Sequence, residues 1–82
     1  MYTLASIQEK LGALNGFVEV LDESALHRGH AGYREGIVTH IKVKIESRSD
    51  ITKIALHRLV YNILKEEIEQ GLHAIAIESI AI

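Results

Sequence analysis

Cysteine, proline and tryptophan are all absent from this chain of 82 residues. Without cysteine the protein can form no disulfide, and a soft metal or metal cluster bound here would need thiolate ligands from a partner. The absence of proline, together with 48% apolar and 24% charged residues, is typical of a compact, ordered protein and not of a linker or a disordered tail. The length predicts one domain over residues 1–82.

Positive charge is not in excess either. The formal net charge is −2, so no general field attracts nucleic acid or an anionic membrane surface. No stretch approaches the ~20 apolar residues of a membrane span, and the N-terminal segment lacks the basic flank and continuous apolar run of a signal peptide. We therefore expect a cytoplasmic protein that does not associate with a membrane.

Two segments show the spacing of apolar residues that is typical of amphipathic helices. The first covers residues 4–14, and the second covers about residues 51–70. Ser49 or Asp50 can cap the N-terminus of the second helix, and Gly71 can end it. Each helix presents one apolar side, so both are expected to pack on the same core.

Three further segments, residues 17–22, 37–46 and 72–82, have the length and the β-branched composition of strands. In the second of them, the residues of the two sides alternate. One side carries Thr39, Ile41, Val43 and Ile45, and the other carries His40, Lys42, Lys44 and Glu46. This alternation predicts a strand that is buried on one face only, with its histidine and its two lysines on a solvated face.

The element order αββαβ predicts an α+β fold. The first two strands should form an antiparallel hairpin, and the second helix is a crossover that returns the chain to form a parallel neighbour of the second strand. The expected result is a three-stranded mixed sheet in the order 1-2-3 with both helices packed on one face.

A long irregular segment over residues 22–36 carries His27 and His30. Hairpin loops normally have about two to five residues, so a connection of this length suggests a functional use. Parallel strands start at the same edge of a sheet, and His73 at the start of the third strand should therefore lie near this loop. His57 is in the crossover helix, which begins at the opposite edge, and should be remote from it.

Four blocks of the chain resemble, in this order, the blocks of the BolA-like family. They are residues 22–32, which include both loop histidines, residues 39–43, residues 57–61 and residues 72–77. The resemblance covers about residues 4–79. It implies one BolA-like domain, with the αββαβ order of a class II KH-like fold.

The resemblance also implies a non-enzymatic adaptor that pairs with a monothiol glutaredoxin, one with a Cys-Gly-Phe-Ser active site. The two proteins would share a [2Fe-2S] cluster, for iron–sulfur trafficking or iron sensing, and this chain alone would hold none. The glutaredoxin cysteine and glutathione, bound through that partner, would supply sulfur. The family's ligating histidines fall on His73 and, in its histidine-bearing branch, on His27, while His30 is a candidate substitute ligand or hydrogen-bond donor. Neutral imidazole in place of thiolate tends to raise the reduction potential.

Two other readings concern the second helix and the class of function. His57, Arg58 and Tyr61 are expected to have a structural or partner-binding role and not to bind metal.

The rival function is a KH-like, nucleic-acid-binding transcriptional regulator. A KH site needs a GXXG loop, and residues 47–52 contain no glycine, so any nucleic-acid binding should be weak. We expect no enzyme, because the sequence shows no acid–base carboxylate pair, no nucleophile beside a base and no phosphate-binding glycine loop.

Overall fold

The computed structural model describes residues 2–14, 16–47 and 52–81. Their elements, in chain order, are α1 (Leu4–Leu11), β1 (Phe17–Asp22), the short 3₁₀ helix η1 (Ser24–His27), β2 (His40–Ser47), α2 (Lys53–Ile63), α3 (Lys65–Gln70) and β3 (Ala74–Ala81). Among these residues, no helix has the length and apolar character needed to cross a membrane.

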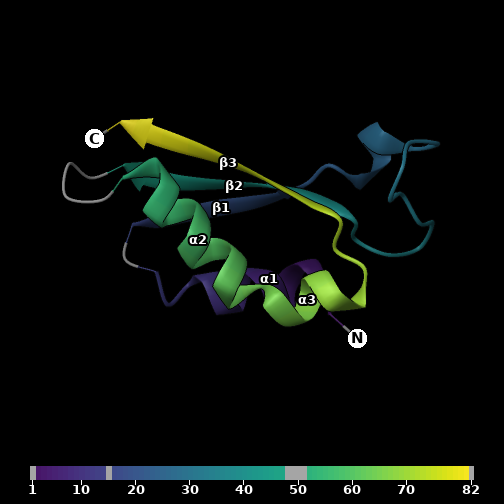
Figure 1. The fold of residues 1–82 in the computed structure, drawn as a ribbon, viewed down its shortest axis with the longest axis horizontal. Coiled ribbons are helices and arrows are strands. Elements are labelled where there is room, and N and C mark those ends of the chain that lie inside the picture. Colours follow the sequence, from purple (N-terminus) through teal and green to yellow (C-terminus); the bar gives the residue numbers. More distant parts are fainter. Residues whose placement is uncertain (1, 15, 48–51, 82) are drawn as a thin grey trace.

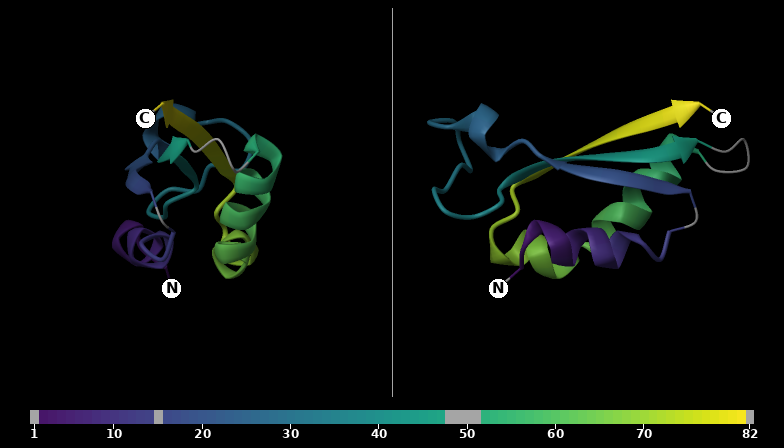
Figure 2. Two further views of the ribbon diagram at one scale, coloured as in Figure 1. Left: turned by 90° about the vertical axis from the view of Figure 1, so that its left-hand side faces the viewer. Right: turned by 180° about the vertical axis from the view of Figure 1, so that it is seen from behind.

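The sheet has the predicted α+β topology. Its strand order is β1-β2-β3, with β1 antiparallel to β2 and β3 parallel to β2. The α-helices α1, α2 and α3 lie on one side of the sheet, as Figure 1 and the end-on view of Figure 2 show. The prediction of a mixed three-stranded sheet with helices on one face is therefore confirmed.

The core lies between that face and the helices. The four residues predicted to point inward, Thr39 just before β2 and Ile41, Val43 and Ile45 within it, are at most 2% exposed, as the alternation predicts for this face. Opposite them lie buried side chains of the helices and of the segment after α3, namely Ile7, Leu11, Leu56, Val60, Leu64 and Leu72. Burial of this apolar surface is the main force that holds the helices to the sheet.

The helix boundaries differ from the prediction in two places. The first helix ends at Leu11 and not at residue 14, because the N–H groups after Gly12 turn back to carbonyls three residues earlier. The predicted long helix is divided in two at Leu64, whose φ of −98° and ψ of 18° leave helical geometry. Thr52 caps α2 by accepting the Ala55 N–H at 3.1 Å; the predicted caps at residues 49 and 50 lie outside the described residues. Gly71, with φ of 138°, ends α3 as predicted.

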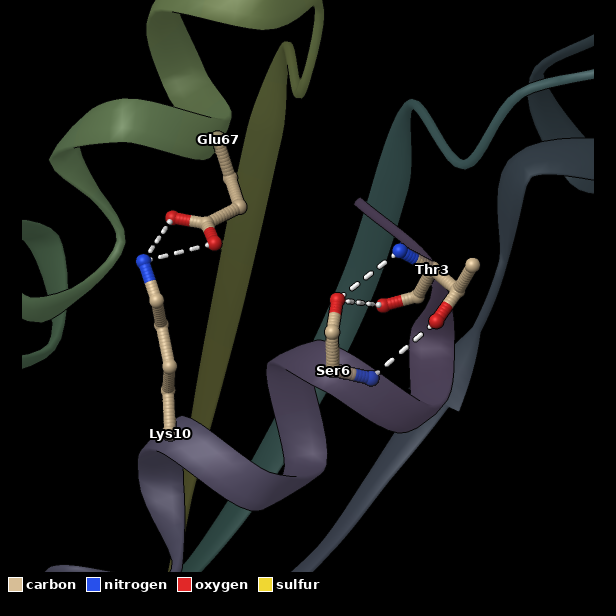
Figure 3. A network of polar contacts seen from close by, with 4 residues as sticks. All are labelled: Thr3, Ser6, Lys10 and Glu67. Carbon is tan, nitrogen blue, oxygen red and sulfur yellow. Dashed lines mark hydrogen bonds and ion pairs between the residues drawn. The ribbon is translucent and has the colours of Figure 1, made fainter. Parts of the chain in front are cut away.

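Polar contacts fix the start of α1 and join it to α3 (Figure 3). Thr3 and Ser6 form a capping box, in which each side-chain oxygen accepts the backbone N–H of the other residue, at 2.8 and 3.1 Å. Lys10 reaches the buried carboxylate of Glu67 with Nζ to oxygen distances of 2.8 and 3.0 Å. The helix division at Leu64 thus places α3 where its one buried carboxylate meets a cation.

Candidate functional site

The loop between β1 and β2 is anchored by Ser24, the first residue of η1. Its buried hydroxyl accepts hydrogen bonds from the backbone N–H groups of Thr39 at 2.8 Å and His40 at 3.2 Å. The Ser24 N–H in turn donates to Asp22 Oδ1 at 3.0 Å. Glu23 N–H donates to the His40 carbonyl at 2.9 Å. These bonds satisfy the backbone groups of the turn and fix η1 against the start of β2.

Four imidazole rings gather where this loop meets the sheet. The His27 ring stacks on the His40 ring, with centroids 3.9 Å apart and planes 6° apart. His30 stands edge-on to His27 at 5.7 Å, and His73 is tilted against His40 at 5.4 Å. We call these four residues the histidine cluster. The structure thus brings both loop histidines and His73 to one end of the sheet.

His73 is held from two sides. Its backbone N–H donates to the Thr39 carbonyl at 2.8 Å, which sets the residue just before β3 begins. Gly32, in the middle of the loop, packs directly on its ring, since a Cβ at Gly32 would overlap Cγ and Cδ2 of His73. Gly32 has φ of 83°, a conformation that favours glycine. His73 is nevertheless an exposed residue, so a partner can reach it.

The prediction that His40 lies on a solvated face is wrong. The alternation predicts the correct face of the sheet for His40. The residue is nevertheless only 5% exposed, because the loop folds over this end of that face. The hydroxyl oxygen of Thr39 lies 2.8 Å from His40 Nδ1. The two lysines of the same face do lie toward solvent and are half-buried in ion pairs, Lys42 with Glu23 and Lys44 with Glu19 and Glu78.

The burial of His40 gives a pH prediction. Desolvation lowers the pKa of His40 below its ordinary 6.5, and the nearby His27, His73 and His30 lower it further. Below pH 6.5 the unfolded chain therefore takes up a proton at this residue that the folded chain does not. The contribution of His40 to the free energy of unfolding should be complete above pH 6.5 and should be lost progressively as the pH drops toward the folded-state pKa. Urea unfolding between pH 7.5 and 5 measures this slope.

The matched variant for this prediction is His40→Gln, which keeps a polar side chain but does not titrate. It should flatten the slope below pH 6.5, even if its stability at pH 7.5 is lower than that of the parent. An equal slope in parent and variant would assign the pH dependence to other groups.

Within the described residues, no group of three or more histidine, cysteine or acidic side chains is arranged to hold a metal ion. The histidine cluster instead brings together separate imidazoles from the loop, from the start of β2 and from the residue before β3, with His73 and His30 exposed, His27 half-buried and His40 buried.

Residues 7–81 match the family described as BolA-like protein. The chain belongs to the BolA-like family. It is 40% identical over 77 residues to "Protein BOLA1, chloroplastic" of Arabidopsis thaliana, which covers 89% of this chain and 47% of that protein. It is also 36% identical over 67 residues to "UV-induced protein uvi31" of Schizosaccharomyces pombe, covering 76% of this chain and 66% of the relative. The chain thus spans about half the length of the first relative.

Two solved structures are similar to this BolA-like chain. BolA1 from Arabidopsis thaliana superposes with a TM-score of 0.73 at 37% identity, over 99% of this chain and 93% of that one. The BolA domain of SufE1 from the same plant gives a TM-score of 0.70 at 30% identity, over 95% and 89%. Both agree with the α+β fold described above.

The residues predicted to face a partner lie elsewhere on the BolA-like fold. His57, Arg58 and Tyr61 are exposed on α2, which begins at the end of the sheet opposite the histidine loop (Figure 1). His57 and Arg58, with Lys53 and Ile54, line a shallow hollow of ≈420 Å³. The Tyr61 hydroxyl donates to the Ile75 carbonyl at 3.3 Å and so also ties α2 to β3. This surface is separate from the histidine cluster.

Sequence reasoning missed three residues that shape the cluster of this BolA-like chain. They are Ser24, Gly32 and His40. Ser24 carried a detectable signal, because an Asp two residues before a serine is a common start of a turn. The contacts of Gly32 with His73 and of His40 with His27 join residues 41 and 13 positions apart, and no local pattern reports them.

Proposed function

We propose that this BolA-like chain is a non-enzymatic adaptor that pairs with a monothiol glutaredoxin and co-ligates a [2Fe-2S] cluster through His73 and His27. The observation that carries the proposal is the histidine cluster itself, in which an exposed and a half-buried imidazole from two chain segments converge at one end of the sheet. The role in the cell would be iron–sulfur trafficking or iron sensing.

The metal-ligating side chains of this chain fit a cluster site that is shared with a partner better than a site formed by this chain alone. Neutral imidazole nitrogen is a good iron ligand, but the chain has no cysteine, and the described residues form no group of three or more metal-binding side chains. A partner must therefore add the thiolates. In this proposal the glutaredoxin supplies one from its own cysteine and one from the glutathione that it binds.

The residues of this chain would bind and orient, and they would perform no reaction. When bound, the cluster supplies a redox-active iron pair whose potential is raised by imidazole in place of thiolate. His73 stands just before β3, where its backbone bond to Thr39 fixes its position. His27 is carried by η1, which the Ser24 hydroxyl holds on β2. His30 stands edge-on to His27 and is the candidate substitute ligand or hydrogen-bond donor.

The direct test is reconstitution. The protein is mixed with a Cys-Gly-Phe-Ser glutaredoxin, glutathione, ferric iron and sulfide without oxygen, and the visible circular dichroism spectrum is recorded. A spectrum that differs from that of the glutaredoxin homodimer, with one copy of each protein in the isolated complex, supports the proposal. A spectrum identical to the homodimer's, with the BolA-like chain eluting separately, contradicts it.

The alternative, a KH-like transcriptional regulator, has one favourable feature. Helix α2 contains Lys53 and Arg58 and no acidic residue. These are only two cations in a chain whose net charge is −2, so few counterions would be released on binding. We predict dissociation constants for DNA or RNA no tighter than the non-specific range of roughly 10⁻⁴ to 10⁻⁶ M near physiological salt. Fluorescence anisotropy that gave nanomolar, sequence-dependent binding there would favour the regulator instead.

Two further expectations accompany the adaptor. The exposed α2 residues His57, Arg58 and Tyr61 would contact a partner protein without touching the cluster. A cytoplasmic location remains a prediction, and the word "chloroplastic" in one relative's name does not support it.

A further inference from the structure

Of the four rings in the histidine cluster, His40 is the buried one. It is 5% exposed and lies between two proposed ligands, with its ring centroid 3.9 Å from that of His27 and 5.4 Å from that of His73. A partner's cluster reaches exposed nitrogen atoms far more easily than buried ones. The central position of His40 therefore needs a different explanation from that of its neighbours.

The His40 ring is fixed more firmly than the rings around it. Its residue begins β2 and is paired with Ala74 of β3. Its backbone N–H donates to Ser24 Oγ, and its Nδ1 lies 2.8 Å from the hydroxyl of Thr39, which is fully buried. A side chain with both its backbone and its ring held in this way has one orientation.

His27, in contrast, stands on a four-residue 3₁₀ helix within a loop. Its ring stacks in parallel on the ring of His40 and makes a T-shaped contact with the ring of His30. Parallel stacking at 3.9 Å restricts the plane of the His27 ring. Because both ring nitrogens lie in that plane, at its edge, the stack leaves them free to bind iron.

We propose that His40 is a positioning residue, a flat platform that sets the plane of the His27 imidazole and its separation from His73 without itself binding the cluster. The assignment of His27 as a ligand rests on the function proposed above. The platform itself does not, because it concerns the free protein.

The platform is tested first in the free protein by NMR. A ring stacked on another shifts the His27 ring protons upfield, so His40→Leu, which keeps a buried side chain of similar size but has no ring, should remove that shift. His40→Phe, which keeps a flat ring, should retain it. His57→Phe on exposed α2 is the matched control and should change nothing. Retention of the shift in His40→Leu, with thermal unfolding showing a folded protein, would overturn the proposal.

The second measurement uses the mixed complex with glutaredoxin, and it separates a platform from a ligand. His40→Phe should still form the complex, because the ring is kept and no ligand is lost. His40→Leu should weaken cluster retention roughly 10- to 100-fold, the range found when a residue that orients a metal ligand is removed. Loss of the cluster in His40→Phe with the His27 shift intact would make His40 a ligand and the proposal wrong. If even the parent forms no mixed complex, the proposed function fails, and the NMR comparison alone decides the platform.

Discussion

His73→Ala is expected to abolish the visible circular dichroism spectrum of the mixed complex while leaving the free protein folded. His73 is an exposed residue, and the bond that fixes it runs from its backbone N–H to the Thr39 carbonyl, which alanine keeps. A substitution of this kind should change the free energy of unfolding by no more than about 1 kcal/mol. Thermal unfolding and the reconstituted spectrum, measured on the same preparation, check both halves of the expectation.

The control for this variant is His57→Ala. His57 is also exposed, but it lies on α2, which begins at the opposite end of the sheet. It should leave the spectrum unchanged. If His57→Ala removed the cluster and His73→Ala did not, both the ligand assignment and the placement of the site at the histidine loop would be wrong.

Gly32→Ala is expected to have almost as large an effect, although it removes no ligand. The added Cβ would overlap the ring of His73, and the backbone of His73 cannot retreat because β3 begins at the next residue. Either the loop lifts or the ring turns away, and both separate His73 from the rest of the histidine cluster. We expect the mixed-complex spectrum to be lost or strongly reduced.

The same loop supplies matched controls for this substitution. Gly29 and Gly36 have φ of 83° and 85°, close to the 83° of Gly32, but an added Cβ at either meets no atom within 4 Å. All three alanine variants carry the same backbone strain, about 1 kcal/mol or somewhat more. The unfolding temperature should therefore fall by similar amounts in Gly29→Ala and Gly36→Ala and by more in Gly32→Ala, where the overlap with His73 adds to the strain, and only Gly32→Ala should impair the complex. Equal impairment in all three would show that loop strain matters and the contact with His73 does not.

Much of the fold could be predicted because its signals are local. The alternation along β2 indicates which face of the sheet each residue occupies, and a helix between two strands is the crossover connection that a parallel pairing needs. That pairing is what placed His73 at the histidine loop. The division of the long helix at Leu64 could not be predicted from local signals. Val60 and Leu64 continue the apolar spacing of a single helix up to the division, and both are fully buried.

The candidate site was only partly predictable. Its exposed histidines stand out in the sequence, but the contacts that orient them depend on how a long loop folds over the sheet. Alternation places His40 on the face of the sheet away from the α-helices, but it does not indicate which segment covers that face. Burial of His40 follows from the bonds of Ser24 to the start of β2, which are tertiary contacts across a separation of 15 and 16 residues.

The anchoring of the loop by Ser24 also divides it into two parts with different tolerance to change. Residues 22–27 are fastened to β2 before the loop leaves the sheet. Residues 33–36 follow the contact of Gly32 with His73, and an added Cβ at Gly36 would meet no atom within 4 Å. Lengthening a flexible loop costs little free energy, so extra residues near position 36 could be accommodated without moving His27. Homologous chains could therefore differ in loop length there and still keep the same arrangement of imidazoles, and a reporter peptide inserted at that point would sit beside the site without disturbing it.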